Sequence, residues 1–140
     1  MGKKSLLCGS SGSGQATKAC NNMLLATTMI GVGESFNLGI NLGLDPKKLF
    51  DILSASTGSC WAINSYCPIK NVGPTSPADN NFKPGFSANL MLKDLTIAYK
   101  AIQITKSKAP FGIKAQKNFK KMVDENQGSF DFSAITKFNE

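Results

Sequence analysis

The amino-acid sequence predicts an all-α fold, a multi-helix bundle arranged around one long central helix. Apolar residues recur at helical spacing, without a proline, over residues 13–43. The same spacing returns over residues 87–105 and 110–125. No convincing run of alternating apolar and polar residues indicates strands, and no internal repeat is present.

The first helix is expected to span about thirty residues, which exceeds the usual 8–20 of globular helices. It is apolar nearly all round, so we expect other helices or another subunit to pack on several of its sides. Gly31 and Gly33 permit close approach of a neighbouring backbone and permit a bend. The apolar residues that follow the helical spacing are Ala16, Ala19, Cys20, Met23, Leu24, Thr27, Ile30 and Ile40.

A strong boundary separates the first helix from the second. Gly43 is a typical helix stop, Asp45 a typical N-cap, and Pro46 a typical first helical residue. The second helix ends at residues 57–58, and its apolar stripe is Leu49, Ile52 and Leu53.

A short helix is predicted over residues 59–66, and Pro68 ends it. We interpret Trp61 in this helix as a core residue. Residues 68–86 contain four prolines among Asn, Gly and Ser, which predicts a long irregular loop. Loops of that length in a compact domain tend to be functional.

The remaining helices are predicted to bury one stripe each. Residues 87–105 bury Met91, Leu95, Ala98 and Ile102, and Lys93 and Asp94 lie off this stripe. Residues 110–125 bury Phe111, Ala115, Phe119 and Met122. Asp131 is expected to cap a terminal helix in which Ile135 and Phe138 are buried.

The chain has 140 residues, of which 41% are hydrophobic. This length and composition are those of a single domain with its own core. The net charge of +7 comes from scattered lysines without any arginine, so bidentate reading of guanine or phosphate is absent. We therefore expect no nucleic-acid partner, and keep charge-driven nucleic-acid binding as a third hypothesis.

The absence of histidine removes Ser-His-Asp and Cys-His catalytic units and any zinc site that uses histidine. We expect no metal, and catalysis must use lysine, carboxylates or a cofactor. The four cysteines form no C-x-x-C pair, so we interpret them as reduced thiols of an intracellular protein. No apolar run looks long and charge-free enough to span a membrane, and no cleavable targeting segment is visible.

A glycine-rich stretch precedes the first helix and leaves its N-terminus open. Gly9, Gly12 and Gly14 keep side chains away from free backbone N–H groups, where an anionic ligand would bind well. The same composition is typical of a flexible connector or a cloning residue. Because the spacing is G-x-x-G-x-G and no βαβ context surrounds it, it is not a dinucleotide or P-loop fingerprint.

Lys18 and Asn22 are four residues apart, so their side chains lie on one face of the helix, about a turn from each other. An ammonium and an amide at this separation can hold one small ligand. The alternative is that Lys18 is an ordinary solvated surface residue.

Four short motifs follow one another along the chain and together resemble the C-terminal half of the β-hydroxyacid dehydrogenase family. Each alone is weak, but four in this order and spacing are specific, and the likeness extends from Cys8 onward. The motifs are Gly9-x-x-Gly12-x-Gly14-x-x-x-Lys18-x-x-x-Asn22, Leu42-Gly43-Leu44-Asp45, Ser56-Thr57-Gly58 before Trp61, and Gly85-Phe86-x-x-x-Leu90-x-x-Lys93-Asp94-Leu95.

The resemblance implies a role for each matching residue. Lys18 would be the catalytic lysine that exchanges a proton with the substrate oxygen, and Asn22 would orient the substrate carboxylate and hydroxyl. Gly12 and Gly14 would clear space for the substrate. Phe86 would line the nicotinamide and substrate pocket.

Two further residues are assigned to the cofactor by the same resemblance. Lys93 would reach the cofactor from this domain, and Asp94 would fix the local geometry beside it. The alternatives are core packing for Phe86 and a solvated helix edge for Lys93 and Asp94.

The resemblance also implies the setting of the domain. Residues 1–140 would be one helical substrate-binding and oligomerisation domain, similar to the C-terminal domain of 6-phosphogluconate dehydrogenase, without the family's N-terminal Rossmann domain. The whole enzyme would oxidise 3-hydroxyisobutyrate or a similar small 3-hydroxy acid with NAD, or with NADP, as in valine breakdown. We expect this fragment alone to be inactive.

The expected partners are the small hydroxy acid, the Rossmann domain and other subunits in a homo-oligomer, a dimer or a tetramer, with no membrane. The compartment would be the mitochondrion in a eukaryote and the cytoplasm in a bacterium. The alternative function is a stand-alone, non-catalytic helical oligomerisation module.

Overall fold

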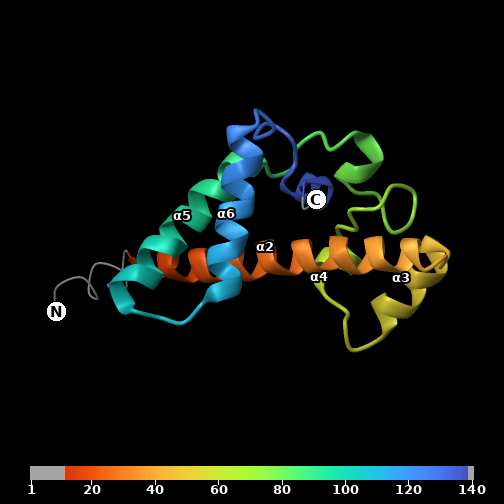
Figure 1. The fold of residues 1–140 in the computed structure, drawn as a ribbon, viewed down its shortest axis with the longest axis horizontal. Coiled ribbons are helices and arrows are strands. Elements are labelled where there is room, and N and C mark those ends of the chain that lie inside the picture. Colours follow the sequence, from red (N-terminus) through yellow and green to blue (C-terminus); the bar gives the residue numbers. More distant parts are fainter. Residues whose placement is uncertain (1–11, 139–140) are drawn as a thin grey trace.

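The computed structural model describes residues 12–138, and within this range it is an all-helical domain, as predicted (Figure 1). No β-strand occurs in that range, where Ser87 and Asp131 form an isolated antiparallel bridge. The elements in chain order are α2 (Gly12–Asn41), α3 (Pro46–Ala55), α4 (Trp61–Asn64), the 3₁₀ helix η1 (Pro77–Asn80), α5 (Ala88–Thr105), α6 (Pro110–Asp124) and the 3₁₀ helix η2 (Phe132–Lys137).

Helix α2 is the central strut on which the other elements are arranged. In Figure 1 it runs along the length of the molecule, with α5 and α6 across its N-terminal half and α3 beside its C-terminal end. It packs against α3, α4, α5, α6 and η2, so the expected neighbours on several sides are present. Gly43 ends it with a positive φ of 86°, a conformation that glycine adopts without cost.

Only one face of α2 is deeply buried. Of the apolar residues that follow the helical spacing, Ala19 is buried, whereas Cys20, Leu24 and Ile40 are exposed. Because the helix is apolar nearly all round, its hydrophobic spacing does not single out one face; small residues mark the face where neighbours approach closely. The buried residues are Ala19, Asn22, Ala26, Met29, Val32, Gly33, Phe36 and Gly39.

Gly33 shows this close approach, whereas Gly31 does not. A β-carbon built on Gly33 would lie 2.5 Å from Thr136 Cγ2 and 2.6 Å from Thr136 Cβ of η2. A β-carbon on Gly31 would meet nothing within 4 Å. The helix continues through both residues without a break.

Helix α2 is also long and apolar enough to span a membrane. Its most apolar 18-residue segment has a mean hydropathy of 1.3, and 33% of that segment is buried. The expectation that no apolar run would qualify was therefore wrong. Helix α2 meets these criteria although it carries two charged residues, Lys18 and Glu34. The core helix of a soluble protein passes the same test, so this finding alone is weak evidence for a membrane.

Helix α3 begins where the sequence predicts. The Asp45 carboxylate accepts a hydrogen bond from the Lys48 backbone N–H at 3.1 Å, and Pro46 occupies the first turn. Leu49 and Leu53 are partly buried. Ile52 was predicted to join them but is exposed. Helix α3 contacts α2, α4 and, through Phe50, the loop at Gly73, and these contacts leave Ile52 uncovered.

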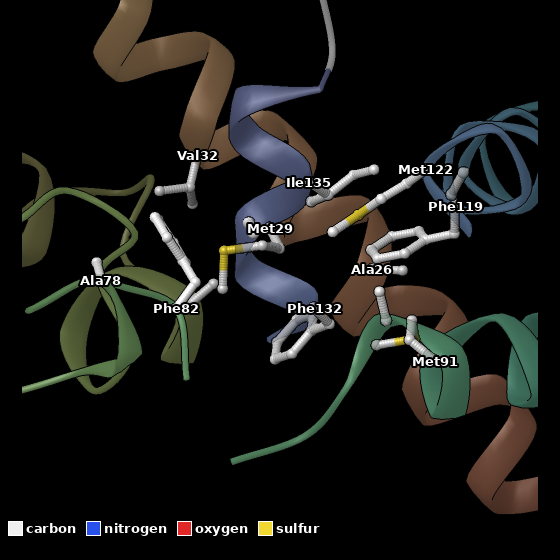
Figure 2. Packing of buried hydrophobic residues seen from close by; sticks show 14 of the residues in the cluster. Ala26, Met29, Val32, Ala78, Phe82, Met91, Phe119, Met122, Phe132 and Ile135 are labelled. Carbon is white, nitrogen blue, oxygen red and sulfur yellow. The ribbon is translucent and has the colours of Figure 1, made fainter. Parts of the chain in front are cut away.

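The core lies between α2, α5, α6 and η2 and extends to α4 and η1, and Ala78 of η1 and Phe82 contribute to it (Figure 2). The predicted stripe of α5 is buried throughout, and so are Ala115, Phe119 and Met122 of α6. The prediction that Phe111 is a core residue was wrong, since 75% of this residue is exposed. The buried face of α6 starts one residue later, at Gly112, which packs against Met23.

The terminal segment folds as expected around its cap. The Asp131 carboxylate accepts from the Ser133 backbone N–H and begins η2. Ile135 is fully buried, whereas Phe138 is partly buried against the core. The loop between α4 and α5 contains the short helix η1. A capping box formed by Ser76 and Asp79 caps the N-terminus of η1.

Candidate active site

Helices α2 and α5 bring three of the predicted site residues into direct contact. The Asn22 amide Nδ2 donates to Asp94 Oδ2 at 2.6 Å, and Lys18 Nζ lies 3.4 Å from Asp94 Oδ1. One carboxylate on α5 therefore holds both the amide and the ammonium of α2.

Asp94 is not part of a solvated helix edge. It is 6% exposed, because it lies on the α5 face that packs against α2. A carboxylate buried this deeply needs partners, and Asn22 and Lys18 supply them. Lys18 itself remains 62% exposed, so its ammonium is accessible to a ligand.

A small pocket of about 170 Å³ lies over this contact, between α2 and α5. We call it the α2–α5 pocket. The predicted residues Lys18, Phe86, Lys93 and Asp94 all contribute to it. Its full lining is Gln15, Lys18, Ala19, Phe86, Leu90, Lys93, Asp94 and Ile97.

Asn22 lines a second pocket, of about 340 Å³. Phe86 lines both this pocket and the first. We call the second pocket the aromatic pocket. Its lining is Asn22, Leu25, Trp61, Tyr66, Gly85, Phe86 and Phe132. Phe86 therefore forms a wall of both pockets, although it is also partly buried against the core.

Trp61 and Tyr66 are pocket residues that sequence reasoning missed. Trp61 was predicted to be core, but it is 52% exposed. Its ring stacks on Tyr66 with centroids 4.8 Å apart, and Tyr66 stacks in turn on Phe132 at 5.4 Å. An aromatic residue in a short amphipathic helix has the same sequence signature in a core and in a pocket wall, so the pattern could not separate the two.

The environment of Tyr66 favours its neutral form. Burial is the larger cause and the hydrogen bond from its hydroxyl to Asp131 Oδ1, at 2.8 Å, is the second; both raise the pKa of Tyr66 above its ordinary value. Tyr66 is therefore a neutral phenol at the wall of the pocket.

Gly12 and Gly14 lie in the first turn of α2, which begins at Gly12. Neither lines the α2–α5 pocket or the aromatic pocket, although Gln15, the residue after Gly14, lines the α2–α5 pocket. A β-carbon on Gly14 would meet nothing within 4 Å. Gly9 and Cys8 lie outside the described residues.

Other predicted chemistry can be placed as well. Cys20, Cys60 and Cys67 are free thiols, and burial raises the pKa of Cys67. Within residues 12–138, no three or more Cys, Asp or Glu side chains are grouped to hold a metal ion.

A protein-family profile matches residues 12–139, and the family is described as the NAD-binding domain of NADP-dependent 3-hydroxyisobutyrate dehydrogenase. The chain belongs to this family. The resemblance seen in the four sequence motifs is thereby confirmed, and so is the expectation of a nicotinamide cofactor, NAD(P), for the family.

Relatives of known name agree with this assignment. A probable 3-hydroxyisobutyrate dehydrogenase of Mycobacterium tuberculosis is 45% identical over 135 residues, which are 96% of this chain and 46% of the relative. The mitochondrial 3-hydroxyisobutyrate dehydrogenase of Homo sapiens is 44% identical over 138 residues, 99% of this chain and 41% of the relative. The chain thus spans less than half the length of these relatives.

Solved structures show the same fold. The Mycobacterium tuberculosis 3-hydroxyisobutyrate dehydrogenase with L-serine superposes with a TM-score of 0.86 and 45% identity, over 90% of this chain and 43% of that one. A 3-hydroxyisobutyrate dehydrogenase of Salmonella typhimurium shares the fold at 19% identity, with a TM-score of 0.76, over 90% and 42% of the two chains.

Proposed function

We propose that this chain is the helical substrate-binding domain of an NAD(P)-dependent dehydrogenase that oxidises a small 3-hydroxy acid to its semialdehyde. The observation that carries the proposal is the contact of Lys18 and Asn22 with the buried Asp94, at the edge of a small pocket, in a chain of this family.

Lys18 is the proposed proton-transfer residue. During oxidation its neutral amine takes the hydroxyl proton of the substrate, and in the reverse direction its ammonium returns that proton to the developing alkoxide. The nicotinamide cofactor, when bound, supplies the acceptor for the hydride that leaves the carbon bearing this hydroxyl. Asp94 holds the Lys18 ammonium at the edge of the α2–α5 pocket.

Asn22 is the proposed substrate-orienting residue. Its Nδ2 donates to Asp94 Oδ2, and its Oδ1 accepts from Asn21 Nδ2 at 3.1 Å, so the plane of the amide is fixed next to the aromatic pocket. The second hydrogen of Nδ2 can donate to a ligand. A fixed amide can hold the carboxylate or hydroxyl of a small acid in one orientation, and such orientation contributes strongly to rate. Gly12 and Gly14 remain proposed as residues that clear space for the substrate.

The pockets fit the small end of the cofactor and the substrate. A volume of about 170 Å³ accommodates a ring or a small acid, whereas a whole dinucleotide needs a larger site. Lys93 and Phe86 would hold the nicotinamide end, with Asp94 fixing the geometry beside them. We propose that a Rossmann domain of the whole protein binds the rest of NAD or NADP.

The first candidate substrate is 3-hydroxyisobutyrate, after the names of the relatives, which would place the enzyme in valine breakdown. L-Serine, which accompanies the similar Mycobacterium tuberculosis structure, is chemically also a small 3-hydroxy acid and is the second candidate. The name of the human relative supports a mitochondrial location in a eukaryote. For a bacterial source, we propose the cytoplasm.

The test is a cofactor-reduction assay of the full-length protein that contains this chain. We expect reduction of NAD or NADP with 3-hydroxyisobutyrate or L-serine, and none with lactate, whose hydroxyl lies one carbon closer to the carboxylate. Absence of reduction with every 3-hydroxy acid and both cofactors would contradict the proposal.

A second candidate function is self-association, alone or as part of the enzyme. Leu38 and Leu42 lie one turn apart near the C-terminal end of α2, and both are exposed. An exposed apolar surface of this kind favours a homo-oligomer, a dimer or a tetramer. Sedimentation that gives only monomer at high concentration would exclude it.

A further inference from the structure

Asp131 is a fully buried carboxylate that no assigned role explains. It is 0% exposed and lies in the segment between α6 and η2, more than forty residues along the chain from the Phe86 region. Its Oδ2 accepts from the Ser133 backbone N–H at 3.0 Å and from Ser133 Oγ at 2.6 Å. These two bonds account for the cap of η2.

The other oxygen is used differently. Asp131 Oδ1 accepts from the Tyr66 hydroxyl at 2.8 Å and from the backbone N–H groups of Gly85 and Phe86, both at 3.0 Å. Two backbone bonds reinforce the attachment, from Asp131 N to Phe82 O and from Phe132 N to Phe86 O, both 2.8 Å.

The three residues bound by Oδ1 all line the aromatic pocket, and Phe86 also lines the α2–α5 pocket. Asp131 lines neither. We propose that Asp131 is a positioning residue of the active site. It fixes Tyr66 and Phe86 relative to each other and to Asn22, which lines the same aromatic pocket. This inference rests on the proposed function of the site.

The geometry explains why the residue is an aspartate. A helix cap alone is served equally well by Asn, Ser or Thr. Here five donors converge on two oxygens, whereas an asparagine offers one acceptor oxygen and would turn its NH₂ group toward donors on one side. Gly85 belongs to the same arrangement, since a β-carbon there would lie 2.8 Å from the Tyr66 hydroxyl oxygen.

The test uses the full-length protein with the substitution Asp131→Asn and the control Ser133→Ala. The control removes one bond to Oδ2, on the side of the carboxylate away from the pockets. We expect Asp131→Asn to lower kcat/KM about 10- to 100-fold, since small displacements of positioning groups cost that much. We expect Ser133→Ala to lower Tm while kcat and KM stay unchanged.

Asp131→Ser separates positioning from capping if the asparagine variant does not fold. Serine retains an oxygen for the η2 cap but leaves Tyr66, Gly85 and Phe86 without their acceptor, so we expect the same loss in kcat/KM. Unchanged kinetics in a folded variant would overturn the proposal. Failure of both variants to fold beside a folded Ser133→Ala would also overturn it, by making Asp131 a support of the fold itself.

A second readout does not depend on dehydrogenase activity. Trp61 is the single tryptophan of this chain and stacks on Tyr66, so its fluorescence in the 140-residue protein reports the position of Tyr66. We expect Asp131→Asn to shift the emission and Ser133→Ala to leave it unchanged. If the wild-type enzyme turned over no 3-hydroxy acid, the proposed function would fail, while an unchanged Trp61 emission would still refute the role of Asp131.

Discussion

Lys18 has an exposed side chain, yet its ammonium lies 3.4 Å from an oxygen of the buried Asp94 carboxylate. Because Lys18 is exposed, solvent screens its ion pair with Asp94, whereas the buried carboxylate also has Asn22 as a hydrogen-bond partner. The ion pair therefore matters mainly for the position of the ammonium. It keeps a cation at the edge of the α2–α5 pocket, one turn from Asn22.

Tyr66 provides a prediction at the same scale. Its pKa is raised, mainly by burial, so the folded protein favours the neutral phenol. The resulting stabilisation is complete below the unfolded pKa, about 10, and is lost as pH rises through the higher folded pKa. An ultraviolet titration of tyrosinate should show one ionisation above the ordinary range, and Tyr66→Phe should remove it. Ionisation of every tyrosine near pH 10 in the folded protein would contradict this.

The residues of the site differ in how far the sequence could identify them. Lys18, Asn22, Phe86, Lys93 and Asp94 stood in motifs of ordered spacing, and the structure places all five around the two pockets. Asp131 was predictable only as a helix cap and Trp61 only as core, because neither residue type reveals its partners from distant parts of the chain.

At the scale of elements, helix α2 likewise has features that the sequence predicts and features that it does not. Its C-terminal end and the start of α3 were predictable because glycine, aspartate and proline act locally, at Gly43, Asp45 and Pro46. Its buried face was not, because apolar residues surround the helix and only the tertiary neighbours decide which of them are covered. Gly33 is covered by η2, which is nearly a hundred residues away in the chain.

Gly33→Ala and Gly31→Ala form a matched pair on this helix. The first places a β-carbon against Thr136 and should destabilise the domain by about 1–3 kcal/mol. The second adds a β-carbon in open space and should be neutral or stabilising by up to about 1 kcal/mol, from helix propensity. Denaturant unfolding of both variants measures the difference. Equal stabilities would show that η2 does not approach Gly33 as described.

At the scale of the whole molecule, the residues of the candidate site come from separated segments, around residues 18–22, 61–66, 85–86 and 93–94, and Asp131 is hydrogen-bonded to Tyr66, Gly85 and Phe86 from outside the pockets. The all-α class was predictable because each helix carries its own spacing and stop signals. The pockets were not, since they arise where α2, α4, α5, η2 and the loop before α5 meet. The chain also spans less than half the length of its relatives, so these pockets are proposed as one side of a site that the whole protein completes.

The central claim is that Lys18 transfers the substrate proton, and the kinetics of Lys18→Ala in the full-length enzyme test it most directly. Lys48→Ala, on the exposed surface of α3, is the matched control. We predict that Lys18→Ala lowers kcat with 3-hydroxyisobutyrate or L-serine by about 100-fold or more, with Tm nearly unchanged, and that Lys48→Ala changes neither. A kcat for Lys18→Ala within about two-fold of wild type would contradict the account.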